Sequence, residues 1–233
     1  MPESDLRDVS LVAVTSHEMR APLAAIRGFV DLLQRRRAEL SEAEVEEFLR
    51  VISVQTDRLI RLADDLVTME SLDDDTLTVS HEAIVVVPAL EQLVRELPAG
   101  DRIELRISAD APPSIETDSI RFAQVLSNLL TNALKYSDQD ATVTLAVDDA
   151  AADRVWISVI DRGIGIRDDE LDRVFEPFYR TVEGARAAEG TGLGLTITRR
   201  LVEALEGTIA AEPTPGGGTT FRVTLPVRAS SAR

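Results

Sequence analysis

Apolar residues recur along the first seventy positions at alternating steps of three and four. That spacing is typical of long amphipathic helices packed along a heptad seam. The first seam comprises Val9, Val12, Ser16, Met19, Leu23, Ile26, Val30 and Leu33, and the second comprises Phe48, Ile52, Gln55, Leu59, Leu62, Leu66 and Met69. The short charged link at residues 37–44 predicts an antiparallel hairpin. Because a lone hairpin cannot bury both seams, we expect two copies to form a four-helix bundle.

Beyond an acidic break at residues 71–75, helical and strand patterns are mixed. Helices are expected at 88–97, 119–136 and 191–205, and strands at 103–107, 143–147, 155–160, 208–211 and 220–225. Several strands are joined by too little chain for a helical crossover, which favours a mixed sheet under helices. The predicted fold class is α+β with two domains: a helical hairpin at residues 1–72 and an α/β sandwich at 73–228, followed by a disordered tail at 229–233.

The composition narrows the functional classes. With 41 acidic and 25 basic residues the formal net charge is −16, which disfavours nucleic-acid binding. The chain has no cysteine and two histidines, which excludes disulfides, thiolate sites and multi-histidine metal centres. No apolar run reaches the roughly 18 residues of a membrane helix, and the N-terminus lacks a signal pattern. We therefore expect a soluble, cytoplasmic chain without membrane contact.

One of the two histidines, His17, follows the seam residue Ser16 and is predicted to point about 100° away from the seam, toward solvent. Glu18 places a carboxylate beside the imidazole, where it can accept a proton or favour the nucleophilic tautomer. Pro22 removes a backbone hydrogen bond and is predicted to bend the helix just beyond the histidine. Taken alone, an exposed histidine is more often an ordinary surface residue, but a bend beside it suits access by a reactant.

The helix at 119–136 carries a polar face beside its apolar one, formed by Arg121, Gln124, Asn128, Asn132 and Lys135. Asparagine is a poor helix former, but its amide oxygen is a hard ligand suited to Mg²⁺. Lys135, the one lysine of the chain, is suited to phosphate. A plain solvated helix face is the alternative interpretation of this row.

Two glycine-rich runs could also approach phosphate. Residues 161–166 follow a strand and residues 190–195 open a helix, where glycines permit close approach and backbone amides attract anions. Neither run matches a Walker loop or a Rossmann fingerprint, so a nucleotide site here belongs to another fold. Residues 176–189, between the runs, form a loop of small and charged residues and are a candidate mobile lid.

Together these segments resemble the catalytic core of the bacterial sensor histidine kinases. The similar segments are SHEMRAPL at 16–23 (H box), NLLTNALKYS at 128–137 (N box), DRGIGI at 161–166 (G1 box), FEPFYR at 175–180 (F box), GTGLGL at 190–195 (G2 box) and the closing strand pattern at 218–226. The resemblance extends from about residue 5 to residue 227. It implies a two-component signalling protein with a dimeric phosphotransfer hairpin and an ATP-binding domain of the GHKL type, also called the Bergerat fold.

The resemblance implies an ATP-dependent kinase that phosphorylates its own His17, with Glu18 as acid–base partner, and passes the phosphoryl group to an aspartate of a cognate response regulator. It assigns Asn132 to Mg²⁺, with Asn128 assisting at the metal and the phosphates. The remaining assignments are Lys135 to phosphate, Tyr136 to the nucleotide, Asp161 to the adenine amino group, and Gly163, Gly165, Gly190, Thr191, Gly192, Leu193 and Gly194 to the walls of the site and the lid hinge. His81 matches no box, and we interpret it as structural.

The resemblance leaves some features of this chain open. Family members usually carry an upstream sensor module, so we expect either a fragment, whose full-length protein could be membrane-attached, or a protein regulated by partners. Ala21 stands where many such kinases carry a Thr or Asn that supports dephosphorylation of the regulator, so weak regulator phosphatase activity is expected.

Two other functions compete with this interpretation. One is a catalytically silent dimeric scaffold that binds nucleotide, which the intact His17, Asn132 and Asp161 argue against. The other is a GHKL-type ATPase or serine kinase, which would not need the H box on a paired-helix hairpin.

Overall fold

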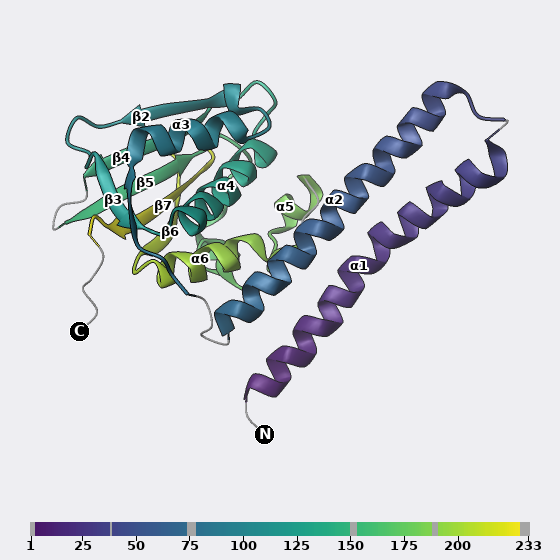
Figure 1. Cartoon of the computed structure of the whole chain (residues 1–233), viewed down its shortest axis with the longest axis horizontal. Helices are drawn as coiled ribbons and strands as arrows, with labels where there is room; N and C mark the ends of the chain where they lie inside the picture. Colours follow the sequence, from purple (N-terminus) through teal and green to yellow (C-terminus); the bar gives the residue numbers. More distant parts are fainter. Residues whose placement is uncertain (1–2, 38, 74–77, 150–152, 188–190, 229–233) are drawn as a thin grey trace. The chain divides into compact units, whose positions relative to one another are not determined.

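A computed structural model describes residues 3–37, 39–73, 78–149, 153–187 and 191–228 of the chain (Figure 1). Within the first helix, side chains are described at Thr15 and from Met19 onward. The chain divides into two compact units, Met1–Glu70 and Ser71–Arg233. The sequence prediction placed this boundary at residues 72/73.

The first unit is a hairpin of two long helices, α1 (Glu3–Arg36) and α2 (Glu42–Asp73), which run side by side in opposite directions (Figure 1). Helix α1 continues through Pro22. The start of α2 is a capping box: the backbone N–H of Ser41 donates to Glu44 Oε2 at 2.8 Å, and that of Glu44 donates to Ser41 Oγ at 3.3 Å. The rings of Phe29 and Phe48 meet across the hairpin with centroids 5.0 Å apart.

The hairpin buries one face of α2 and leaves another open. The seam predicted for α2 is half-buried or buried, and Leu62 and Met69 are its most deeply buried members. A second row, here called the outer stripe, lies about 100° round the helix and is exposed along its whole length. The outer stripe comprises Leu49, Ser53, Thr56, Ile60, Ala63 and Val67. Leu23 of α1, a predicted seam position, is also exposed.

The second unit is built on a five-stranded sheet of order β2-β4-β5-β7-β6. Its strands are β2 (Ile103–Ile107), β4 (Val143–Asp149), β5 (Arg154–Ile160), β6 (Thr208–Pro213) and β7 (Thr219–Pro226). β2 and β4 are parallel, and the other neighbours are antiparallel, so the sheet is mixed as predicted. A separate antiparallel pair is formed by β1 (Glu82–Val85) and β3 (Ser114–Thr117).

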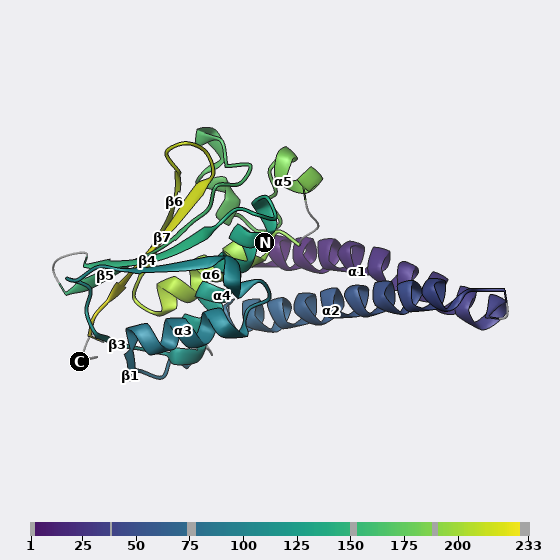
Figure 2. The same cartoon turned by 90° about the horizontal axis from the view of Figure 1, so that it is seen from above.

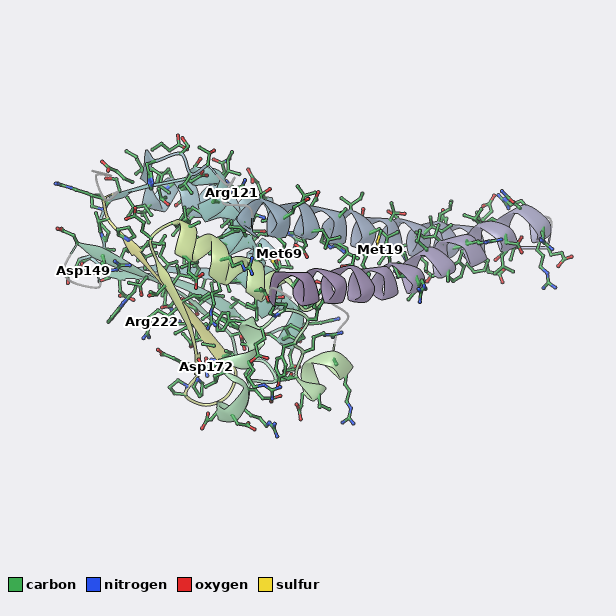
Figure 3. All side chains as sticks on the ribbon, turned by 90° about the horizontal axis from the view of Figure 1, so that it is seen from below. Met19, Met69, Arg121, Asp149, Asp172 and Arg222 are labelled. Carbon is green, nitrogen blue, oxygen red and sulfur yellow. The ribbon has the colours of Figure 1, made fainter. Side chains whose placement is uncertain are left out.

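Three helices cover one face of the five-stranded sheet: α3 (Val86–Glu96), α4 (Ser119–Tyr136) and α6 (Gly194–Ala204) (Figures 1 and 2). The core lies between them; on β5, for example, Val155, Ile157 and Val159 are buried. Trp156 and Arg222 lie on the other face, where the Arg222 guanidinium is 5.1 Å from the indole centroid; Figure 3 labels Arg222 on β7. One covered and one open face is the usual arrangement for a largely antiparallel sheet.

Short elements complete the second unit. They are the helix α5 (Val182–Ala187) and the 3₁₀ turns η1 (Gly100–Arg102), η2 (Asp168–Glu170) and η3 (Arg173–Phe175). Among the described residues, no helix is long and apolar enough to span a membrane.

The α+β fold class is confirmed, and some predicted elements need correction. The helix expected at 191–205 begins at Gly194, because Thr191 and Gly192 belong to the turn before it. The segment 176–189, expected to be a loop, contains α5. The strands β1 and β3 were not predicted, because each has only four residues, too few for a strand pattern to be distinguished from the surrounding chain. The tail expected at 229–233 lies outside the described residues.

Candidate functional site

The polar row of the sequence lies along α4, whose position is fixed at its start and on its apolar face. The Asp118 carboxylate caps the helix by accepting from the backbone N–H of Arg121 at 3.0 Å. Its other oxygen accepts from the backbone N–H of Ser80, before β1, at 3.0 Å. The apolar face of α4 is buried against the sheet and α6 through Phe122, Val125, Leu126, Leu129, Leu130 and Ala133. Asn128, Asn132 and Lys135 follow one another at steps of four and three and therefore share one face of this anchored helix.

The Asp161 carboxylate, directly after β5, is held from two sides. Its Oδ1 accepts from the backbone N–H of Gly163 at 2.9 Å and of Thr219 at 3.0 Å. The residue is only 5% exposed, and this burial raises the pKa of the Asp161 carboxyl above its usual value, although the two N–H donors act to lower it. No described residue donates to Oδ2. A fixed carboxylate with one unused oxygen can accept a hydrogen bond from an amino group such as that of adenine.

Glycines bring the loop after β5 into direct contact with its neighbours. A Cβ on Gly163 would overlap the carbonyl oxygen of Tyr136, which accepts from the backbone N–H of Ile164 at 3.2 Å. Gly165 has a φ of +72°, which a residue with a side chain rarely adopts. The G1 segment therefore packs directly against the C-terminal end of α4, so that Tyr136 and Asp161 lie in the same part of the domain.

The F and G2 segments are joined through their backbones. The N–H of Phe178 donates to the carbonyl oxygen of Gly192 at 3.0 Å, and a Cβ on Gly192 would lie 2.7 Å from the Phe178 carbonyl carbon. Thr191 Oγ1 accepts from the backbone N–H of Leu193 at 3.2 Å, and the Leu193 side chain is fully buried. Leu193 can therefore serve a ligand only by shaping this turn, whereas Thr191 is half-buried and Gly190 lies outside the described residues.

The candidate lid approaches α4 at Tyr136. A Cβ on Gly184 of α5 would lie 3.8 Å from Cε1 of the Tyr136 ring. α5 is tethered at its start, because the backbone N–H of Gly184 donates to Thr181 Oγ1 at 2.9 Å. The Lys135 ammonium lies 5.1 Å from the centroid of the Tyr136 ring. The structure thus brings Tyr136, Lys135 and the lid segment together.

The predicted metal site can be tested by its donors. Among the described residues, no group of three or more His, Cys, Asp or Glu side chains could hold a metal ion. Among the residues that the structure describes, the carboxamide of Asn132 and the Oδ1 atom of Asn128 have no hydrogen-bond partner. Amide oxygens fit Mg²⁺ when phosphate and water supply its other ligands, so these residues fit a metal that arrives with a nucleotide.

The predicted acceptor, His17, lies on α1 together with Glu18. The side chains of both residues are outside the described part of the structure, so their predicted orientation stays a prediction. His81 lies just before β1, where it is exposed.

One cluster around a buried carboxylate in this domain was not predicted from the sequence. Glu170, buried in η2, accepts from Tyr179 Oη at 2.6 Å and from Arg167 Nε at 2.8 Å, and these hydrogen bonds hold the pKa of its carboxyl below the usual value. The cluster ties the segment after the G1 run to the end of the F segment. In the sequence Glu170 is one of several neighbouring acidic residues, and nothing there separates the buried one from the exposed ones.

Comparison with known proteins gives matches along most of the chain. The model of the His Kinase A (phospho-acceptor) domain matches residues 9–75, and that of the histidine kinase-, DNA gyrase B- and HSP90-like ATPases matches residues 117–229. The sensor histidine kinase WalK of Bacillus subtilis is 35% identical over 223 residues, which are 93% of this chain and 36% of that protein. The chain belongs to the sensor histidine kinase family.

Solved structures of this family have the same architecture. Full-length ShkA in complex with AMPPNP is 28% identical, with a TM-score of 0.67 over 96% of this chain and 46% of that one. ThkA in complex with the response regulator protein TrrA is 23% identical, with a TM-score of 0.72 over 94% of this chain and 61% of that one, and this likeness supports the fold alone. The second unit therefore contains the ATPase-type domain of a histidine kinase, and most of the α1–α2 hairpin falls within the match to the phospho-acceptor domain.

Proposed function

We propose that the chain is the core of an ATP-dependent histidine autokinase that phosphorylates His17 and then transfers the phosphoryl group to an aspartate of a response regulator. Asp161 carries the proposal for the nucleotide, because its buried carboxylate is fixed through Oδ1 while Oδ2 is left to accept from the adenine amino group. The resemblance to ShkA, solved with AMPPNP, supports a nucleotide as ligand. The match of residues 9–75 to the phospho-acceptor domain supports a histidine of this segment as the phosphate acceptor.

The α4 face would bind the phosphates. Asn132, with Asn128 one turn earlier, would hold Mg²⁺ through amide oxygens, and the Lys135 ammonium would contact phosphate. Mg²⁺, when bound, neutralises charge on the phosphate oxygens during transfer. The Tyr136 ring would lie against the nucleotide, and the glycines at 163, 165, 192 and 194, with Gly190, would give the backbone close access to it.

His17 would be the nucleophile. A nitrogen of its imidazole forms the bond to the γ-phosphorus while the bond from that phosphorus to the bridging oxygen of ADP breaks, and ADP leaves. Glu18 would accept the imidazole proton or hold the tautomer that keeps the attacking nitrogen free.

The hairpin would function as a homodimer. Its outer stripe repeats at steps of four and three and is exposed in the single chain, as is Leu23. Such a stripe is typical of a helix that packs against further helices, and a second copy of the hairpin provides them. In such a four-helix bundle, the outer stripe of each copy is buried against the helices of the other copy.

Regulator dephosphorylation would be weak. Ala21, on the exposed side of α1, has no group that can orient a water molecule. Ala21→Thr would restore a hydroxyl there and is expected to speed loss of phosphate from the cognate regulator by about tenfold or more in the presence of ADP. Fast loss with the wild-type chain would contradict this proposal.

The function is tested by incubation with γ-labelled ATP and Mg²⁺. We expect label that is acid-labile and alkali-stable in the wild type and in His81→Ala, and no label in His17→Ala. The two variants remove the two histidines of the chain in turn, so each is the control for the other. ATP binding without label in the wild type would favour the silent scaffold, and ATP hydrolysis without label would favour the ATPase.

A further inference from the structure

A buried threonine on α6 links that helix to α4. Thr198 is 0% exposed, and its hydroxyl donates to the carbonyl oxygen of Gly194, one turn earlier, at 2.8 Å. The hydroxyl oxygen of Thr198, Oγ1, accepts from Nδ2 of Asn128 at 3.3 Å. Asn128 Nδ2 also donates to the Gly194 carbonyl oxygen, at 3.2 Å. The three groups form a closed set of hydrogen bonds between the N-box helix and the start of the G2-box helix.

This set fixes which end of the Asn128 carboxamide faces α6. The carbonyl oxygen of Gly194 can only accept, so the amide atom next to it must be the nitrogen. The Thr198 proton is used on Gly194, which leaves that hydroxyl to accept from the same nitrogen. Oδ1 is consequently the atom left over, and no described residue donates to it.

We propose that Thr198 is a positioning residue of the nucleotide site, which holds the Asn128 carboxamide so that Oδ1, and not Nδ2, is offered to the bound nucleotide. An amide oxygen suits a cation, whereas an amide nitrogen suits a phosphate anion. Asn128 would thus act on the Mg²⁺ side of the ligand, together with Asn132 one turn along α4. This inference rests on the proposed function, since it requires that ATP and Mg²⁺ bind at α4.

The chain contains a matched control for the hydroxyl of Thr198. Thr196 lies two residues earlier on α6 and is also buried, at 4% exposure, but its Oγ1 has no hydrogen-bond partner. Thr→Val at either position removes a buried hydroxyl from the same helix and keeps the shape of the side chain. Only the change at 198 removes a partner of Asn128.

The test is the affinity of the full chain for ATP, measured by calorimetry with Mg²⁺ and again with EDTA. With Mg²⁺ we expect Thr198→Val to bind ATP about three- to tenfold more weakly than the wild type, because the carboxamide loses one of its two acceptors. Thr198→Ser, which keeps the hydroxyl, and Thr196→Val should bind like the wild type. With EDTA, all four proteins should bind alike. Thr198→Ala repeats the loss without a β-branched side chain, should Thr198→Val not fold.

Several results would overturn the inference. They are wild-type affinity of Thr198→Val with Mg²⁺, an equal loss in Thr196→Val, no rescue by Thr198→Ser, or the same loss with EDTA, which would indicate a general distortion of α6. Failure of the proposed function gives different results: either the wild type itself does not bind ATP, or it binds ATP and His17 is not labelled, and the second result leaves the role of Thr198 in binding unaffected.

Discussion

The two units of the chain differ in how completely they bury their apolar residues. In the ATPase-type domain, each of α4, β4, β5 and α6 contributes fully buried leucine or isoleucine side chains, for example Leu126, Leu145 and Ile157. In the hairpin, among the residues whose side chains the structure describes, Leu62 and Met69 are the most deeply buried large side chains, each 2% exposed. The hairpin instead exposes the outer stripe, in which Ile60 is 54% exposed.

This difference separates a self-sufficient domain from an incomplete one. The second unit buries its core by itself, because α3, α4 and α6 cover one face of the sheet (Figure 2). Two helices can cover only one face of each other, so the hairpin depends on further helices for the rest of its apolar surface. The same division separates the proposed chemistry: the proposed acceptor His17 lies in the hairpin, and the proposed nucleotide residues lie in the ATPase-type domain.

The largest effect is expected when the hairpin is removed. A variant lacking residues 1–75 should be a monomer by light scattering, because the outer stripe is gone. It should bind ATP within about twofold of the full chain, since all the proposed nucleotide residues belong to the second unit, which has its own core. If this variant were still a dimer, the dimer contact would lie in the ATPase-type domain, and its assignment to the hairpin would be wrong.

A single charge in the outer stripe tests the same division with the hairpin present. Ile60→Glu should convert the dimer to a monomer, because an unpaired charge buried at an interface costs about 3–5 kcal/mol, or a hundredfold or more in affinity. Ile120→Glu on α4 is the matched control, since Ile120 is 73% exposed in the ATPase-type domain. Equal effects of the two changes in light scattering would contradict the assignment of the dimer to the hairpin.

On the nucleotide side, Asn132→Ala should lower autophosphorylation by about 100-fold or more, because it removes a proposed metal ligand without removing a core side chain. The circular dichroism spectrum and the dimer mass should not change. Gln124→Ala, two turns earlier on the same helix, should label within about twofold of the wild type. Normal labelling of Asn132→Ala would exclude Asn132 as a required ligand of Mg²⁺.

A smaller effect is expected from pH. Burial raises the pKa of Asp161, so its carboxylate takes up a proton at a higher pH than an ordinary aspartate and can then no longer accept through both oxygens. ATP affinity should therefore fall as the pH is lowered from about 8 to about 5, more steeply in the wild type than in Asp161→Asn. For stability the sign is opposite: the contribution of this group is present at low pH and is lost as the pH rises through its raised pKa. Parallel pH profiles of ATP affinity in the two proteins would exclude Asp161 as the titrating group.

Much of the fold was predictable because its main elements carry strong local signals. The helix at 119–136 and the strand at 103–107 have the predicted bounds, and the two long helices follow from their heptad spacing. β1 and β3 could not be predicted, because they are held by pairing with each other and by the Glu116 N–H that donates to the Val227 carbonyl oxygen. That contact joins residues more than a hundred positions apart, which no local pattern encodes.

The candidate site was predictable as a set of residue types and not as a set of contacts. The spacing of Asn128 and Asn132 indicates a shared helix face, but only the tertiary structure shows that Asn128 Nδ2 is committed to α6. The sequence around Thr198 does not indicate its role, because its pattern does not distinguish a threonine that bonds to another helix from one that only fills space in the core. The Asp161 contact with Thr219 likewise depends on the pairing of β5 with β7.

The central claim is that the hairpin supplies the phosphate acceptor and the ATPase-type domain supplies the nucleotide site. It is tested most directly by titrating ATP with Mg²⁺ into His17→Ala and Asp161→Ala side by side. The account predicts that His17→Ala binds ATP like the wild type, and that Asp161→Ala loses binding by about 100-fold, because the adenine amino group loses its acceptor. Weakened binding by His17→Ala, or wild-type affinity of Asp161→Ala, would contradict it.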